Sequence, residues 1–308
     1  MTFGENAREP LGAKAHSRLA AVRAHLELPV VKRAAGALDG RHRSIFSGHG
    51  QDFNEMAQYF PGDDVSDIDW RASASVGQPM IRRFERESNL AMALVVDTGH
   101  SMATAAPGGN SKSRVAQFAC DVIGYLARGR GDTLALVAGD ADRMEHVPAR
   151  GGNDHMESLL RRIESMVAVT GPRSDVTRVL ERASVLLAAQ RTVVVLVTDE
   201  ARPEPGSERI LKILRARHEV LVIRVADASP AEVLGGPVKD VDVDLDLPRY
   251  LWGRRDIVAE ATAFQEARRA SVNQTLAKCG IDSIVVTNET DVVDRLTSLL
   301  ARRPRARA

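Results

Sequence analysis

Over residues 90–302, short apolar runs alternate with stretches in which apolar positions recur every three or four residues. Short runs rich in Val and Leu are typical of strands buried on both faces of a parallel sheet, and the longer spacing is typical of amphipathic helices. The strongest runs cover 91–96 and 192–197, and the clearest helical pattern covers 112–127. This alternation predicts an α/β fold, a doubly wound and mostly parallel sheet with helices on both faces.

The same patterns predict the other elements of this region. Further strands are expected at 133–138, 219–225 and 283–286, with 144–148 pairing with 133–138 as a hairpin. Further helices are expected at 154–167, 175–189, 207–216, 257–278 and 291–302. Asp154 and either Ser174 or Asp175 have the side chains to cap two of these helices at their N-termini.

The rest of the chain divides into three parts. Residues 1–40 form an N-terminal helical segment, since the apolar positions in 13–26 are spaced as in an amphipathic helix. Residues 41–89 are loop-rich, aromatic and acidic, and end in an expected strand at 80–84; their large side chains indicate a folded appendage rather than a linker. Residues 90–302 form the α/β domain, and 303–308 form a basic tail that is expected to be solvated.

The composition limits the classes of function that the chain can have. The net charge of +1 gives no global electrostatic case for binding nucleic acid. No apolar run is long enough for an integral membrane segment. The two cysteines, Cys120 and Cys279, have no metal or disulfide spacing, which is typical of a reduced compartment; a cytoplasmic protein is therefore expected.

Polar residues stand where two of the predicted strands end. Asp97 ends the strand at 91–96, and Asp199 follows the strand at 192–197. In parallel sheets such ends share one edge, where ligands bind. The candidate metal-binding residues are Asp97, Gly99, Ser101, Ser174, Thr177 and Asp199. Their hard oxygens suit Mg²⁺, Mn²⁺ or Ca²⁺; the alternative interpretation is that they are helix caps and strand-end turns.

The stretch Asp97-Thr98-Gly99-His100-Ser101 resembles the Asp-x-Ser-x-Ser signature of the von Willebrand factor type A domain. The resemblance implies a doubly wound α/β fold with a metal-ion-dependent adhesion site (MIDAS). Ser174 would then stand at the position of the family's threonine ligand and Asp199 at that of its distal aspartate. Gly99 replaces the first serine of the signature, which implies a weakened ion site.

A second resemblance is more specific. The stretches 48–55, 59–65 and 68–71 resemble the signature of the domain of unknown function 58 family, in which this block precedes a type A domain. Ala57, Ser66 and Ser75 depart from it at positions where the family often has Arg. The family has no established catalytic activity. Its members are commonly encoded beside MoxR-type AAA+ ATPases, so the resemblance implies an adaptor or co-chaperone.

The signature block also supplies candidate partner-binding residues. They are Glu55, Tyr59, Asp63, Asp64, Asp69 and Trp70. In one interpretation Asp63 and Asp64 pair with Arg71, Arg82 or Arg83 and lock the appendage onto the sheet. In the other, the block is an exposed acidic and aromatic face that binds a partner, since aromatic residues are favoured at binding hot spots.

We therefore expect a non-catalytic protein-interaction module, with a metal-dependent hydrolase and a metal-free scaffold as alternatives. Nucleotide binding at 108–113 is excluded because a phosphate loop needs Gly directly before Lys112, where Ser111 stands. The alternating acids from Asp240 to Asp246 lack the Gly and Glu of a calcium loop. A hydrolase would need a general base, and the sequence offers no strong candidate.

Overall fold

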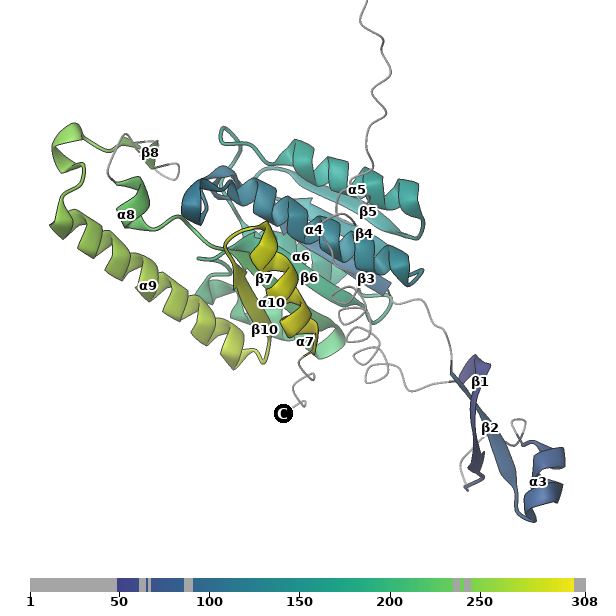
Figure 1. Cartoon of the computed structure of the whole chain (residues 1–308). Helices are drawn as coiled ribbons and strands as arrows, with labels where there is room; N and C mark the ends of the chain where they lie inside the picture. Colours follow the sequence, from purple (N-terminus) through teal and green to yellow (C-terminus); the bar gives the residue numbers. More distant parts are fainter. Residues whose placement is uncertain are drawn as a thin grey trace, which may run out of the picture.

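A computed structural model of the whole chain describes residues 49–60, 65, 68–85, 91–234, 239–240 and 245–301 (Figure 1). The predicted helical segment at 1–40, the basic tail, and Asp63 and Asp64 lie outside the described residues. Among the residues described, no helix combines the length and the apolar character needed to cross a membrane.

The described part of the segment 41–89 contains a small antiparallel unit. Strand β1 (His49–Gln58) pairs with β2 (Met80–Glu85), and helix α3 (Trp70–Val76) lies between them in the chain. Asp69 caps α3, with its carboxylate accepting hydrogen bonds from the backbone N–H groups of Arg71 and Ala72 at 3.0 Å each. The sequence of β1 has no apolar alternation, so sequence analysis found the strand at 80–84 but expected loops where β1 and α3 lie.

The α/β domain is built on one sheet of six strands in the order β10-β7-β6-β3-β4-β5. The strands are β3 (Ala91–Asp97), β4 (Thr133–Gly139), β5 (Met144–Arg150), β6 (Val193–Asp199), β7 (Glu219–Val225) and β10 (Asp282–Val286). All neighbours are parallel except β4 and β5, which form the predicted hairpin. The mostly parallel α/β sheet predicted from the sequence is therefore confirmed.

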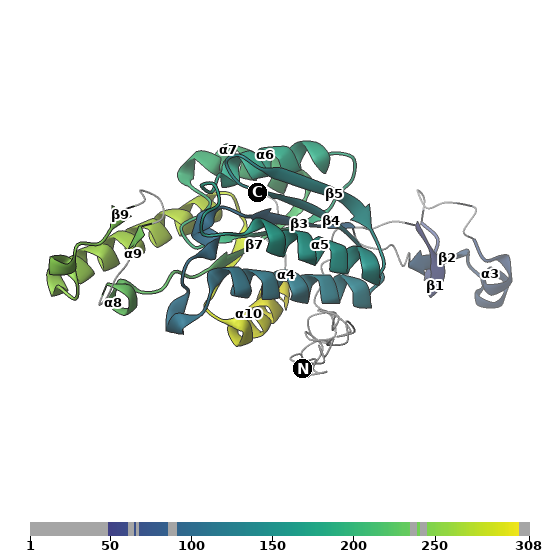
Figure 2. The same cartoon turned by 90° about the horizontal axis from the view of Figure 1, so that it is seen from above.

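Helices cover both faces of this sheet (Figure 2). One face carries α4 (Lys112–Gly129), α5 (Asn153–Met166) and α10 (Glu289–Ala301), and the other carries α6 (Val176–Leu186), α7 (Glu208–Arg217) and the end of α9 (Arg255–Lys278). Asp175 caps α6 as predicted, through a hydrogen bond from the Arg178 N–H. Asp154 does not cap α5, because Gly152 occupies that position.

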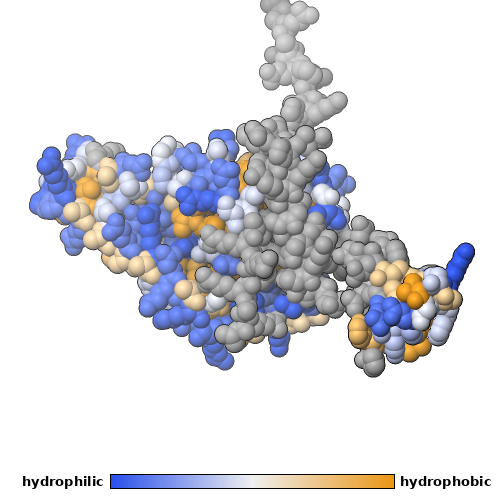
Figure 3. Space-filling view, turned by 60° about the horizontal axis from the view of Figure 1, so that its bottom comes forward, coloured by the Kyte–Doolittle hydropathy of each residue, from blue (hydrophilic) through white to orange (hydrophobic). Residues whose placement is uncertain are grey.

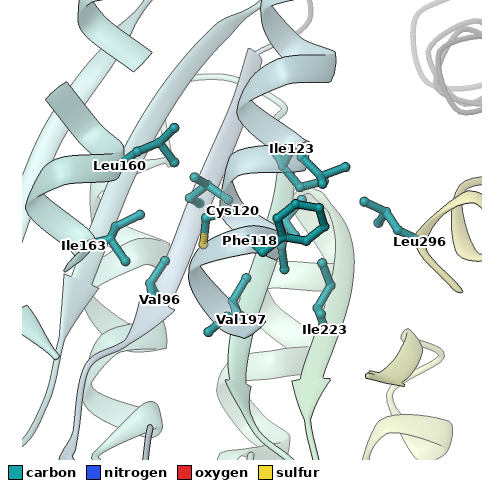
Figure 4. Close-up of a cluster of buried hydrophobic side chains, with 14 of the residues drawn as sticks. Val96, Phe118, Cys120, Ile123, Leu160, Ile163, Val197, Ile223 and Leu296 are labelled. Atoms are coloured by element: carbon teal, nitrogen blue, oxygen red, sulfur yellow. The ribbon is translucent and has the colours of Figure 1, made fainter. Parts of the chain in front are cut away.

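The core consists of two aliphatic layers separated by the sheet. Met92, Leu94 and Val96 of β3 enter the layer under α4, α5 and α10, and Ala93 and Val95 enter the opposite layer. Figure 4 shows part of the first layer, with labels on Val96, Phe118, Cys120, Ile123, Leu160, Ile163, Val197, Ile223 and Leu296. Each buried Val or Leu contributes about 1.5–3 kcal/mol, so this burial explains why the sheet forms.

Short elements fill the connections: α8 (Pro230–Val233), β8 (Lys239–Asp240), β9 (Leu245–Asp246), η2 (His100–Ala103), η3 (Pro107–Gly109), η4 (Pro205–Ser207) and η5 (Arg249–Leu251). Helix α9 buries only Val272, Thr275 and Leu276 near its C-terminal end, and its N-terminal half runs beside α8 beyond the sheet (Figure 1). The chain order of the strands reverses between β3 and β6. In open α/β sheets, ligands bind at the carboxyl ends of strands at such a switch point.

Candidate functional site

Four neighbouring parallel strands end close to an acidic residue. Asp97 ends β3 and Asp199 ends β6, whereas Asp140 follows β4 directly and Asp227 follows β7 by two residues. Asp97, Asp140 and Asp199 are buried, and Asp227 is half-buried. We call these four aspartates the carboxyl edge. Buried carboxylates need compensation by hydrogen bonds or positive charge, so the partners of each one show its role.

Asp140 is compensated by Arg143. Its carboxylate accepts hydrogen bonds from the Arg143 backbone N–H at 2.7 Å and the Arg143 Nε at 2.9 Å, and from the Thr98 hydroxyl at 3.1 Å. Burial acts to raise the pKa of Asp140, but these hydrogen bonds outweigh it and lower the pKa below its usual value. This residue is therefore one half of a structural ion pair.

Asp199 and Asp227 share one cation, the ammonium of Lys112. This lysine begins α4, its side chain is 0% exposed, and its Nζ contacts Oδ2 of Asp199 and lies 2.5 Å from Oδ1 of Asp227. Burial acts to lower the pKa of Lys112, but the attraction of the two carboxylates is stronger and raises it. The other oxygen of Asp199 accepts a hydrogen bond from the Ala201 N–H at 2.7 Å. Both oxygens of Asp199 are thus bonded within the protein.

Asp97 has a different environment. Its carboxylate accepts hydrogen bonds from the Gly99 N–H and the Thr198 hydroxyl, at 3.0 Å each, and from the Ser174 hydroxyl. Burial and, to a smaller extent, the negative charge of Asp199 raise the pKa of Asp97 despite these hydrogen bonds. Among the described residues, every hydrogen bond to Asp97 comes from a neutral donor, so its charge is not compensated by a cation.

Two loops bring hydroxyl groups to Asp97. Ser101 in η2 and Ser174 before α6 have their Oγ atoms 2.8 Å apart. The second loop is held in place by backbone hydrogen bonds from the His100 N–H to the Pro172 carbonyl at 2.8 Å and from the Ala141 N–H to the Arg173 carbonyl at 2.9 Å. A carboxylate and two hydroxyls therefore converge at the end of β3.

Gly99 makes this convergence possible. A Cβ atom on Gly99 would lie 2.2 Å from Oγ, 2.4 Å from N and 2.5 Å from Cα of Ser174. These separations are shorter than any real contact, so no side chain fits at position 99 while Ser174 stays in place. Gly99 contributes space for the Ser174 loop rather than a ligand.

The predicted metal ligands thus fall into two groups. Asp97, Ser101 and Ser174 come together, whereas the Thr177 hydroxyl bonds to the Ser207 hydroxyl at 2.7 Å and Asp199 bonds to Lys112. Across the described part of the chain, no group of three or more His, Cys, Asp or Glu side chains could hold a metal ion. Any ion here would rely on the two serine hydroxyls. Their hard oxygens, with that of Asp97, fit an ion such as Mg²⁺ that also keeps several waters.

Sequence analysis missed Lys112 and Asp227 as members of this edge. One feature of the sequence could have revealed Lys112. It is a lysine in the first turn of a strongly apolar helix, in a chain whose basic residues are mostly arginines. Lysine is almost never fully buried unless it is paired, so such a position indicates acidic partners. The sequence alone does not show which acids these are.

The predicted partner-binding residues are only partly described. Trp70 is 69% exposed and lies in the same small unit as three other exposed apolar residues, Phe60, Val65 and Val76. We call these four the apolar patch; Figure 3 shows apolar residues on the surface of this unit. Tyr59 is half-buried, and the carboxylate of Asp69 is used in capping α3. Glu55 lies in β1, and Asp63 and Asp64 lie outside the described residues.

Comparison with known sequences identifies relatives over nearly the whole chain. The family model described as "Protein of unknown function DUF58" matches residues 55–251. The uncharacterized protein Rv1480 of Mycobacterium tuberculosis is 31% identical over 302 residues, which cover 94% of this chain and 90% of that protein. The uncharacterized protein MAV169 of Mycobacterium avium is 29% identical over 174 residues, which cover 53% of this chain and 96% of that protein.

Solved structures with a similar fold include BatB from Bacteroides thetaiotaomicron, with a TM-score of 0.42 and 14% identity over 69% of this chain and 98% of that one. They also include a von Willebrand factor type A protein from Catenulispora acidiphila, with a TM-score of 0.40 and 11% identity over 70% of this chain and 42% of that one. The six-stranded, mostly parallel sheet with helices on both faces is the doubly wound α/β architecture that the sequence predicted.

Proposed function

Because this chain belongs to the DUF58 family of proteins of unknown function, we propose its role from the geometry of the carboxyl edge. The chain is a non-catalytic protein-interaction module. It holds a divalent ion, Mg²⁺ or else Mn²⁺ or Ca²⁺, through Asp97, Ser101 and Ser174. The ion keeps a coordination position for a carboxylate of the partner protein. The observation that carries this proposal is the convergence of the two serine hydroxyls on a buried carboxylate that has no cation.

The electrostatics of Asp97 support the ion. A carboxylate that is 1% exposed and bonded to neutral donors is unfavourable when charged, and a cation beside it relieves this cost. Ser101 and Ser174 are partly exposed, so the site is open on their side. Mg²⁺ accepts few protein ligands and retains waters, one of which an incoming carboxylate can replace.

We propose a MoxR-type AAA+ ATPase as the partner, with this chain as its adaptor or co-chaperone. This part of the proposal comes from the family resemblance of the signature block. The apolar patch around Trp70 supplies a second contact surface, since exposed aromatic residues are favoured at interfaces. We place the module in the cytoplasm, where the buried free thiols of Cys120 and Cys279 stay reduced.

The proposal assigns no catalytic step to the chain. Hydrolysis at the ion would need a general base beside the attacking group. The described hydrogen bond of the Ser101 hydroxyl goes to the Ser174 hydroxyl, which is not a base at neutral pH. This contact therefore favours ion binding over nucleophilic catalysis.

The test is capture of the purified cognate MoxR-type ATPase by the full chain in the presence of Mg²⁺. We expect capture to be lost with Asp97→Ala or EDTA and weakened with Ser174→Ala. Thr177→Ala is the matched control, because it removes a nearby hydroxyl that bonds to Ser207 instead. Capture that survives both Asp97→Ala and EDTA rejects the ion and leaves a metal-free scaffold. Absence of capture by the unaltered chain rejects this partner.

A further inference from the structure

The ammonium group of Lys112 is a cation that the protein itself supplies to the carboxyl edge, and the start of α4 fixes its position. Lys112 is the first residue of α4, and its backbone N–H bonds to the Thr104 carbonyl at 3.0 Å. The helix behind it packs twelve buried residues, counted from Lys112 to Ala127, against the sheet and its neighbours. The side chain of Lys112 is 0% exposed, so solvent does not compete with the two carboxylates for its ammonium group in this structure.

Lys112 occupies one of the two carboxylates at the switch point of the sheet. Asp97 and Asp199 end the two strands that flank the switch point of the sheet, and their charges repel each other. Two carboxylates placed in this way commonly share a divalent ion. Here the ammonium contacts Asp199 from the side of Asp227, and the Ala201 N–H takes the remaining oxygen of Asp199.

We infer that Lys112 is a built-in counterion that withholds Asp199 from coordination and confines divalent-ion binding at the carboxyl edge to Asp97, Ser101 and Ser174. This inference rests on the proposed ion site. It predicts that replacement of Lys112 increases the affinity of the site for a divalent ion. Asp199, once released, becomes an additional oxygen ligand for the ion.

The experiment measures Mn²⁺ and Mg²⁺ affinity of the full chain by titration calorimetry. Lys112→Met combined with Asp227→Asn removes the ammonium and one carboxylate together, so Asp199 is released without an added net charge. A triple variant that also carries Asp199→Asn removes the released ligand. Arg143→Met is the matched control, because it removes the other cation of the edge, which is bonded to Asp140. Thermal melts with and without Mn²⁺ show whether each variant is folded.

We expect the double variant to bind Mn²⁺ about tenfold tighter or more, equal to about 1.4 kcal/mol, with the gain lost in the triple variant. Arg143→Met should show a smaller gain, since it removes charge without releasing Asp199. Equal affinity of the double variant and the unaltered chain overturns the inference, as does a gain that persists in the triple variant or appears equally in Arg143→Met. If the unaltered chain binds no ion but the double variant binds through Asp199, the proposed ion function fails and the role of Lys112 is supported. Absence of binding in both overturns both.

Discussion

The substitution Gly99→Ser tests whether the loop after β3 has lost a metal ligand at position 99 or instead needs glycine there to make room for Ser174. It restores the first serine of the Asp-x-Ser-x-Ser signature, so a simple comparison of motifs predicts a stronger ion site. The structure predicts the opposite. The φ angle of Gly99 is −64°, so the backbone accepts any residue, but the new Cβ would lie 2.2–2.5 Å from Oγ, N and Cα of Ser174.

The magnitude follows from the atoms that clash. Two of the three are backbone atoms, so rotation of the Ser174 side chain cannot relieve the contact. The loop must move, which strains the hydrogen bonds to the Pro172 and Arg173 carbonyls. Overpacking costs about 1–3 kcal/mol, to which the weakened hydrogen bonds add about 1 kcal/mol. For a domain of this size each kcal/mol lowers Tm by about 2–4 °C, so we expect a decrease of roughly 4–16 °C.

Urea and thermal unfolding measure the loss of stability, and calorimetry measures the affinity for Mn²⁺, which should fall because Ser174 is displaced from Asp97. Gly99→Ala should destabilise equally, since the clash comes from Cβ and not from the hydroxyl. Gly129→Ala is the control; a Cβ there meets no atom within 4 Å, and its effect should be neutral or stabilising by up to about 1 kcal/mol. A Gly99→Ser variant as stable as the unaltered chain, or one that binds Mn²⁺ more tightly, would refute this reasoning.

Three further predictions concern the same residues and the apolar patch. Lys112→Ala alone, without divalent ions, should lower the free energy of unfolding by about 3–5 kcal/mol in urea titrations, because it leaves Asp199 and Asp227 without their cation; a loss below about 1 kcal/mol contradicts this. Burial and, next, the charge of Asp199 raise the pKa of Asp227 to about 6, so the native state holds that proton more tightly than the unfolded state does. The unaltered chain should therefore lose stability relative to Asp227→Asn as the pH rises from about 4 to about 6, and parallel urea midpoints over this range would show that Asp227 is not the group responsible. Trp70→Ala should change the free energy of unfolding by less than about 0.5 kcal/mol yet weaken capture of the partner, whereas Val185→Ala on α6, a residue with similar exposure, should leave capture unchanged.

The sequence predicted the α/β domain closely because its strands are buried on both faces. An uninterrupted apolar run such as 192–197 allows few alternatives, and it corresponds to β6 at Val193–Asp199. The strand β1 was missed for the opposite reason. Its residues carry no apolar alternation, and its order comes from pairing with β2, a non-local contact that a single segment does not encode.

For the candidate site, the sequence predicted which residues lie at one edge of the sheet, but not which of them bond to one another. Strand ends and loop residues placed Asp97, Ser101 and Ser174 at one edge, because topology alone brings the carboxyl ends of parallel strands together. The pairing of Asp199 depends on where the first turn of α4 points, which is a property of helix packing and not of the motif. Nothing in the sequence around Lys112 shows that its partners are Asp199 and Asp227, which lie 87 and 115 residues further along the chain.

Gly99 and Lys112 lie on different elements, but both affect the surroundings of Asp97. Gly99 stands where the type A signature has a serine, and the space that it leaves allows the Ser174 hydroxyl to reach both Ser101 and Asp97. Lys112 neutralises the neighbouring carboxylate, so Asp97 is the buried acid of the edge whose charge is left uncompensated. The loss of one motif residue therefore does not indicate a lost site. The proposed ion would compensate the charge of Asp97, so Asp97 is the first residue to replace in each test of the proposed function.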